Sequence, residues 1–473
     1  MIDRRNLLRG ALLGAGMTAF SGRVLASASR ALEIAGPRSA GDQLLFVFLR
    51  GGNDGVNTLI PQLDPTYQAA RPTLKITNGI ALPGVSYSRL NPDLQRLVGI
   101  DQLGNLALIH QAGDPSASRS HFTAQDMFEK GLSPSPPPTQ SELAAASGFV
   151  PRMLAAAGVP AWDSSQLPAA VSISGLMQTM FRAGKSTQVS AHVRDLAKAG
   201  VPPLMTQVGV KTASLLHGAD HYNDPTSLHD EQLGYELAFG HGTTDALIAL
   251  GFTPGFATSG RFPLSGGELT QAATATGSTV VPTFDGSGAG FMRAAEQAVF
   301  TLVNSPSTRV LGVEYGGFDT HADQATDHPN LMRYLGWALR DMHDEILANN
   351  LGDRITILVV SEFGRTAKEN GSSGPGTDHG VGGLAFAIGE KVKSGTFNIR
   401  GDGAGAREFG KPWRRLLAEP PNPTLVDAVG VETPFRDLLA EAMVKCIGVP
   451  ITALPDALPG YPMHAERFLG YLL

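Results

Sequence analysis

The sequence predicts an α/β protein in which a mostly parallel central sheet is covered by helices on both faces. Four short runs are almost entirely apolar, as is typical of strands buried on both faces of a sheet. Stretches with helical apolar spacing separate these runs, and strands that alternate with helices favour parallel pairing. We therefore expect a single αβα sandwich.

The expected elements follow the chain in order. The predicted strands span residues 43–49, 106–109, 310–315 and 355–360, and the predicted helices span residues 122–130, 291–303, 331–348 and 434–446. Thr433 is expected to cap the last helix, with Pro434 at its first position. Residues 253–289 are rich in Gly, Ser and Thr, and we expect them to form an insertion in one domain spanning residues 41–473.

Composition excludes several classes of protein. The chain has 473 residues, of which 42% are hydrophobic and 17% are charged, so it has ample material for a core and is not intrinsically disordered. Its formal charge is −6 and it has no strong basic block, which argues against nucleic acid as a partner. A lone cysteine, Cys446, excludes an intrachain disulfide framework and a cysteine-based zinc cluster.

The N-terminus predicts export. Arg4 and Arg5 precede an apolar stretch over residues 7–20, and Ala26-Ser27-Ala28 offers a small-x-small cleavage site. Residues 1–28 resemble a twin-arginine signal peptide, which implies the twin-arginine export machinery as a partner and a periplasmic or extracytoplasmic location. The alternative is a disordered basic N-terminus. No later run approaches the ~18 apolar residues of a membrane span, so none is expected.

Each predicted strand is followed at once by a polar cluster. The clusters are residues 51–55, residues 110–114 with 118–121, residues 316–321 and residues 361–366, and the cluster Thr377-Asp378-His379-Gly380 follows a short loop later. In an open parallel sheet, reactive groups gather just beyond the carboxyl ends of the strands. Asp319 and His321 stand two residues apart and can chelate one zinc-like ion, whereas Asp54 taken alone is an ordinary turn residue. We therefore expect one shared polar site with a bound divalent metal.

Ser120 has two interpretations. It precedes a stretch with helical apolar spacing, so Ser118 or Ser120 could simply cap that helix. The same position suits a nucleophile, because the free amides and positive end of a helix attract an anionic group. Arg119 would add a charge-assisted contact to phosphate or sulfate.

Taken together, the motifs resemble the bacterial domain of unknown function 1501 family. The motifs are the twin-arginine start, residues 48–55, 118–122, 317–321 and 361–366, and Asp378-His379-Gly380. That family is in turn similar to the alkaline phosphatase and sulfatase superfamily. The resemblance implies an alkaline-phosphatase-like αβα sandwich, one or two divalent metal ions (Zn, Mg or Ca) and a Ser or Thr nucleophile at a helix start.

The resemblance also implies roles for particular residues. Asp54 would be the first metal carboxylate and Glu362 the partner carboxylate of that site, with Ser120 as the nucleophile. The second metal would be held by Asp319, His321 and His379. Asp378 is a further metal candidate, and Arg119 and Arg365 are further catalytic candidates.

Three departures from the superfamily pattern are present. Asp319 and His321 are separated by one residue rather than three. Glu362-Phe363 stand where the pattern has Asp-His, so one imidazole ligand is missing or comes from elsewhere, such as His110 or His121. Residues 116–119 lack the Cys and Pro of a sulfatase formylglycine motif, which disfavours a modified-residue sulfatase. A metal-independent Ser–His hydrolase is a separate alternative, but no Gly-x-Ser-x-Gly elbow surrounds Ser120.

Two classes of function remain. The first is an exported metal-dependent hydrolase or transferase that acts on a phosphate or sulfate ester of a small molecule or glycan. The second is a non-catalytic envelope protein that uses the same fold as a binding surface. Bound metal at near-stoichiometric amounts would favour the first class.

Overall fold

The computed structural model describes most of the chain from residue 41 onward. The described residues are 41–114, 118–132, 136–161, 166–182, 188, 190–193, 250–252, 255, 259–371, 373–398, 407–409, 429–465 and 467–473. The predicted signal peptide, residues 1–28, lies outside them. The predicted domain, residues 41–473, is thus described in part.

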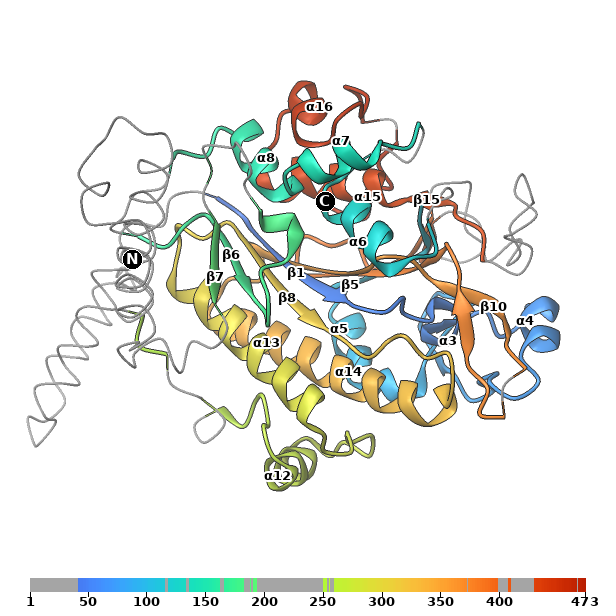
Figure 1. Ribbon diagram of the computed structural model, residues 1–473. Coiled ribbons are helices and arrows are strands. Elements are labelled where there is room, and N and C mark those ends of the chain that lie inside the picture. Colours follow the sequence, from blue (N-terminus) through green and yellow to red (C-terminus); the bar gives the residue numbers. More distant parts are fainter. Residues whose placement is uncertain are drawn as a thin grey trace, which may run out of the picture.

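The central sheet has ten strands in the described residues (Figure 1). In spatial order they are β14 (Glu408–Phe409), β13 (Gly395–Phe397), β5 (Leu106–Gly113), β12 (Gly383–Ile388), β9 (Ile355–Ser361), β1 (Gln43–Leu49), β8 (Val310–Tyr315), β6 (Ala170–Ile173) and β7 (Ser190–Val193), with β15 (Thr433–Pro434) paired to the end of β5. Within this described part of the sheet, only β12 runs antiparallel to its neighbours. The predicted mostly parallel sheet is thus confirmed.

All four predicted strands are present and run in the same direction. β1 and β8 match their predicted bounds, and β9 is one residue longer than predicted. β5 continues four residues beyond its predicted end, through His110 and Gln111. The last residues of β5 include polar side chains, which end the apolar run that predicts the strand. Their backbone nevertheless pairs with β12 and β15.

Helices cover both faces of the sheet, as Figure 1 shows. One layer contains α5 (Val98–Gln102), α12 (Gly266–Thr276), α13 (Gly286–Asn304) and α14 (Gln324–Ala348), and the other contains α6 (His121–Glu129), α7 (Gln140–Ala145), α8 (Phe149–Ala156), α15 (Phe435–Ala442) and α16 (Leu454–Ala457). Because side chains alternate along a strand, β1 supplies both cores. Leu45 and Val47 pack toward the first layer, and Leu44 and Phe46 toward the second.

Smaller elements complete the fold. β2 (Leu59–Ile60), β4 (Arg89–Leu90) and β3 (Ile80–Ala81) form a small sheet, and β10 (Arg365–Glu369) pairs with β11 (Thr377–His379). The short helices are α3 (Gly55–Thr58), α4 (Pro65–Ala70), η1 (Pro92–Leu97), η2 (Thr179–Phe181), η6 (Met443–Ile447) and η7 (Ile451–Ala453). Within the segment predicted as an insertion, Ser265 caps α12 and Asp285 caps α13.

The cap predicted for the C-terminal helix is wrong. Thr433 and Pro434 form strand β15, and the helix α15 begins one residue later, at Phe435. The backbone of Thr433 pairs with Ala112 of β5, and this tertiary contact takes precedence over the local capping preference. Among the described residues, no helix combines the length and apolar character needed to cross a bilayer.

The fold brings the polar clusters to one edge of the sheet. β5, β9, β1 and β8 all run parallel, so their carboxyl ends point to the same side. The hairpin of β10 and β11 lies at that side, beside the short helices α3 and α4 (Figure 1). This edge is where the candidate site is found.

Candidate metal centre

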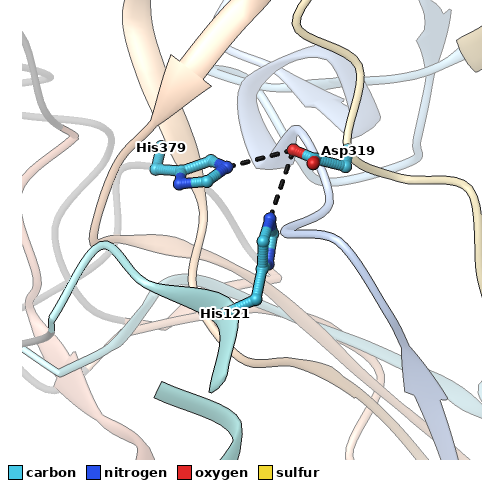
Figure 2. Close-up of side chains that lie close together, drawn as sticks. All are labelled: His121, Asp319 and His379. Atoms are coloured by element: carbon cyan, nitrogen blue, oxygen red, sulfur yellow. Dashed lines mark hydrogen bonds and ion pairs between the residues drawn. The ribbon is translucent and has the colours of Figure 1, made fainter. Parts of the chain in front are cut away.

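Three residues from distant parts of the chain converge at this edge. His121 is the first residue of α6, Asp319 follows β8, and His379 ends β11. One ligand atom from each lies within 4.8 Å of the other two, a grouping that fits a metal ion. Figure 2 shows both imidazoles directed at the same oxygen of Asp319.

The imidazole of His379 is held from behind. Its Nδ1 donates to the backbone carbonyl oxygen of Arg119 at 2.6 Å. A carbonyl can only accept, so Nδ1 carries a proton, and in the neutral ring Nε2 then has a free lone pair. That Nε2 lies 3.0 Å from Oδ1 of Asp319. Burial lowers the pKa of His379, against the opposing effect of the Asp319 hydrogen bond, and so favours the neutral ring that a metal binds.

His121 is oriented in the same way. Its Nδ1 lies 2.8 Å from Oε1 of Glu362, which directs Nε2 toward Asp319 at 3.3 Å. That Nε2 is buried, and the described part of the chain gives it no hydrogen-bond partner. The hydrogen bond to Glu362 raises the pKa of His121, although burial acts the other way, so a cation at Nε2 would replace a proton there.

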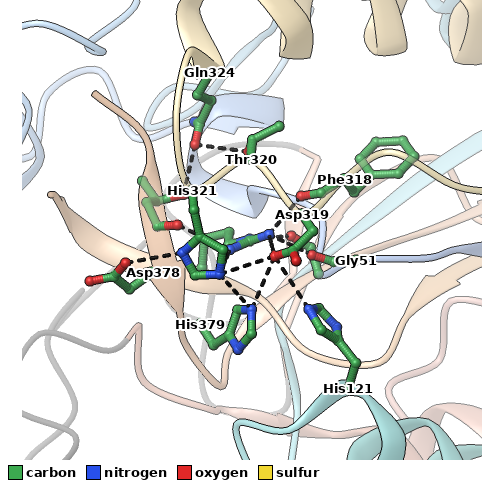
Figure 3. A network of polar contacts seen from close by, with 12 residues as sticks. Gly51, His121, Phe318, Asp319, Thr320, His321, Gln324, Asp378 and His379 are labelled. Carbon is green, nitrogen blue, oxygen red and sulfur yellow. Dashed lines mark hydrogen bonds and ion pairs between the residues drawn. The ribbon is translucent and has the colours of Figure 1, made fainter. Parts of the chain in front are cut away.

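A third imidazole borders the group. Nδ1 of His321 lies 3.1 Å from Oδ1 of Asp378, and its Nε2 lies 3.1 Å from Asp319 Oδ1 and 2.8 Å from Nε2 of His379. Two neutral imidazoles with their Nδ1 atoms protonated cannot bond to each other through Nε2. A cation beside the two Nε2 atoms would relieve this contact. Figure 3 shows the three rings around Asp319.

Asp319 already has one cationic neighbour. Nη2 of Arg365 lies 2.5 Å from Asp319 Oδ1, and about half of the Asp319 side chain is exposed. Partial burial acts to raise the pKa of Asp319, but hydrogen bonds from His379 and Arg365 outweigh it and hold that pKa well below its usual range. The negative charge of Asp319 alone does not call for a metal ion. The case for one comes from the imidazole nitrogens that converge on it.

Arg365, a predicted catalytic residue, is buried beneath Asp319. Besides that carboxylate, its guanidinium donates to four backbone carbonyl oxygens, those of Gly51, Gly52, Phe318 and Thr377, at 2.7 to 3.0 Å. These carbonyls belong to three of the polar clusters. Arg365 therefore links the segments that follow the strand ends, and its side chain is fully buried.

Glu362, a predicted metal ligand, is buried and faces its own set of donors. It accepts from His121 Nδ1, from the side chain of Gln125 at 2.9 Å and from the backbone N–H of Gly51 at 2.9 Å. Burial acts to raise the pKa of Glu362, but these hydrogen bonds lower it overall. A carboxylate behind a metal-binding imidazole fixes the ring and its tautomer.

Asp54, another predicted ligand, does not join the group. Its carboxylate forms a two-point ion pair with Arg71, at 2.6 and 3.0 Å, and both side chains are wholly buried. Burial acts to raise the pKa of Asp54, but the charge of Arg71 lowers it overall. Asp378, by contrast, is 58% exposed and contacts the site through His321.

The segment before α6 borders the site. Ser118, Arg119 and Ser120 are exposed. Ser120 stands at the N-cap of α6, but its side chain makes no capping hydrogen bond. The capping interpretation of this hydroxyl therefore lacks its defining contact.

The donor set fits a borderline divalent ion. Imidazole nitrogen and carboxylate oxygen are the ligands that zinc takes from His and Asp, and three protein ligands leave one position for water or substrate. His121, Asp319 and His379 would hold the ion, and the two groups that accept from the imidazole Nδ1 atoms, Glu362 and the carbonyl of Arg119, would orient the rings. A harder ion such as Mg or Ca would prefer an all-oxygen set.

Sequence reasoning found some of these residues and missed others. The sequence pattern suggests His121 only as a replacement for a missing imidazole ligand, although His121 lies in the motif of residues 118–122. Arg71 and Gln324 cannot be identified as site residues from the sequence, because an Arg in a loop and a Gln at a helix start form no recognisable motif. Both touch Asp54, and that contact depends on the tertiary fold.

Fold and site together define an α/β protein with a candidate His/Asp/His metal centre at the carboxyl edge of its sheet. The family model described as "Protein of unknown function (DUF1501)" matches residues 275–408, so the resemblance read from the motifs is confirmed over this segment. The segment contains Asp319, Glu362 and His379. No curated protein is significantly similar to the chain in sequence.

Solved structures with a similar arrangement are distant. Ps i-CgsB, solved in complex with k-i-k-neocarrahexaose, is 10% identical with a TM-score of 0.36, over 86% of this chain and 72% of that chain. The PsFucS1 sulfatase from Pseudoalteromonas sp. is 8% identical with a TM-score of 0.33, over 95% and 74% of the two chains. The phosphonate monoester hydrolase SpPMH from Silicibacter pomeroyi is 10% identical with a TM-score of 0.31, over 89% and 77%.

Proposed function

We propose that this protein is an exported metal-dependent hydrolase or transferase that acts on a phosphate or sulfate ester of a small molecule or glycan. The observation that carries the proposal is the convergence of the Nε2 atoms of His121 and His379 on Asp319 Oδ1. Each Nδ1 faces an acceptor behind it, so both rings offer a lone pair to the same point. Such an arrangement suits a cation better than any contact among the residues themselves.

A bound divalent ion would screen the charge of the ester and stabilise the negative charge that develops in the transition state. The chain's own residues prepare that place. Glu362 and the carbonyl of Arg119 hold the two imidazoles, and Arg365 holds the loop that carries Asp319. An anionic ester would thus meet a preorganised metal centre.

Ser120 is the proposed nucleophile. Its two neighbours in the chain both contact the centre: the carbonyl of Arg119 accepts from His379, and His121 faces Asp319. Its backbone is thereby fixed beside the centre, at the start of the nine-residue helix α6. The positive end of that helix favours an anionic group, which supports both ester binding and a deprotonated hydroxyl.

The experiment is elemental analysis of the purified protein combined with a screen of aryl phosphate and aryl sulfate esters. We expect a divalent metal at near-stoichiometric amounts and hydrolysis of one ester class. Asp319→Ala should lose both metal and activity. Ser120→Ala should keep the metal and lose turnover. A metal-free protein without esterase activity would contradict the proposal and favour the binding-protein alternative.

Export is a separate part of the proposal. We infer that the chain is carried across the membrane by the twin-arginine pathway and released after cleavage near Ala28, because Arg4 and Arg5 precede an apolar stretch. Replacing both arginines with lysine should abolish export of the folded protein. Unchanged export of that variant would show that the pathway is wrong.

A further inference from the structure

We propose that the chain binds a single metal ion, because the guanidinium of Arg71 occupies the place where the resemblance to alkaline phosphatases implies a first metal. The inference rests on the proposed function, since the one ion is that of the His121, Asp319 and His379 centre. Arg71 would be a built-in cation that serves Asp54 in place of a metal.

Both oxygens of Asp54 are already taken. Nη1 of Arg71 lies 2.6 Å from Oδ2, and Nη2 lies 3.0 Å from Oδ1. Gln324 donates to Oδ2 at 2.5 Å, and the backbone N–H of Asn57 donates to Oδ1 at 3.3 Å. A carboxylate has about four lone-pair sites, and these four donors fill them.

Arg71 is not free to swing away from Asp54. Its Nε donates to the carbonyl of Ala367 and its Nη2 to the carbonyl of Thr366, both at 2.8 Å, so the guanidinium also bridges to strand β10. Its side chain is wholly buried. A metal ion at Asp54 would have to displace a wholly buried cation, and it would leave these carbonyls without their donor.

The second carboxylate that the resemblance assigns to the first metal is also engaged. Oε1 of Glu362 accepts from His121, Gln125 and the backbone of Gly51. Oε2 accepts from the hydroxyl of Ser361 at 3.0 Å. Both carboxylates that the resemblance assigns to the first metal are therefore engaged by donors from the described residues.

Asp54 keeps a role as a positioning residue. Gln324, which donates to Asp54, accepts through its Oε1 from Thr320 at 3.1 Å and from Thr377 at 2.7 Å. Thr320 follows Asp319, and Thr377 lies two residues before His379 in β11, so one amide joins the loop that carries Asp319 to the strand that carries His379. Figure 3 shows Gln324 beside Thr320. The buried ion pair anchors that amide from below.

The test is the number of ions bound at saturation. Untagged full-length protein is stripped with a chelator and dialysed against zinc chloride, and bound zinc is measured per chain by elemental analysis. We expect one ion. Two ions bound with comparable affinity would overturn this inference and leave the proposed function intact, whereas no bound ion would overturn both.

Variants locate the ion. The double substitution Asp54→Leu with Arg71→Met replaces the buried pair with apolar side chains and should still bind one ion at saturation. His379→Ala should bind none. If the unaltered protein binds two ions and the double variant binds one, Asp54 is a ligand and the inference is wrong. If the double variant does not fold, the count for the unaltered protein still decides.

Discussion

His379 and Arg119 are joined by a hydrogen bond of 2.6 Å from the imidazole Nδ1 to the backbone carbonyl oxygen. The bond links a strand at the end of the β10–β11 hairpin to the segment that leads into α6. It fixes which nitrogen of His379 faces Asp319, and it places Ser120 beside the candidate centre. The site is thus assembled from backbone contacts as well as from side chains.

Glu362→Gln should weaken metal binding while the fold remains intact. The neutral amide orients and polarises the His121 ring less than the carboxylate does, and residues behind a ligand typically contribute about 10–100-fold to affinity. Competition with a fluorescent zinc chelator measures the effect. Asp126→Asn is a matched control on α6, the helix that begins with His121, because among the described residues Asp126 forms an ion pair with Lys130 alone, at a partly exposed position. Equal affinities for the two variants would contradict the role of Glu362.

Arg71→Met should destabilise the protein strongly. It leaves the wholly buried carboxylate of Asp54 without its cation, and breaking such a pair costs about 3–5 kcal/mol. The free energy of unfolding in urea measures the loss. Arg261→Met removes a partly exposed pair with Glu345 and should cost no more than about 1 kcal/mol. Similar losses for both variants would show that the Asp54 pair is not special.

Gly51→Ala should disrupt the site. Gly51 has a φ of +115°, and a Cβ there would lie 2.4 Å from the backbone nitrogen of Asp319. The loop carrying Asp319 would have to move, so we expect a loss of metal binding as well as stability. Gly104→Ala is the control, because Gly104 has a φ of +79° with no atom within 4 Å of the added Cβ, and it should cost only about 1–2 kcal/mol of backbone strain. Unchanged metal affinity in Gly51→Ala would contradict the close approach.

His110 should make stability fall in mild acid. Burial lowers the pKa of His110 to about 4, against an ordinary value near 6.5. Because the unfolded chain takes up the proton first, stability is fully present above about pH 6.5 and declines as the pH falls to about 4, by about 3 kcal/mol. Urea unfolding across this range, compared with His110→Gln, isolates the contribution. Parallel curves for the two proteins would contradict it.

The central strands of the sheet could be predicted from the sequence because each contains a nearly continuous apolar run. β1 and β8 are buried on both faces, so their apolar runs mark their bounds. The predicted β5 is too short because the polar residues His110 and Gln111 are typical of a loop. Pairing with β12, which the sequence pattern does not indicate, extends the strand. Short strands such as β15 depend on pairing alone and leave no pattern in the sequence.

The candidate site was predicted in outline, but its internal order was not. Motif order placed Asp319 and His379 at one edge of the sheet, and the fold brings them together. Which carboxylate faces a metal and which faces an arginine depends on residues far away in sequence. Arg71 lies 17 residues after Asp54, and nothing in the spacing distinguishes an ion pair from a ligand.

Anomalous diffraction at the zinc edge, from crystals of the protein grown with zinc, tests whether His121, Asp319 and His379 hold the metal ion. We expect one strong peak about 2.0–2.2 Å from Nε2 of His121, Nε2 of His379 and a carboxylate oxygen of Asp319. No peak at this position in zinc-replete crystals, or a peak at Asp54 with Arg71 displaced, would contradict it.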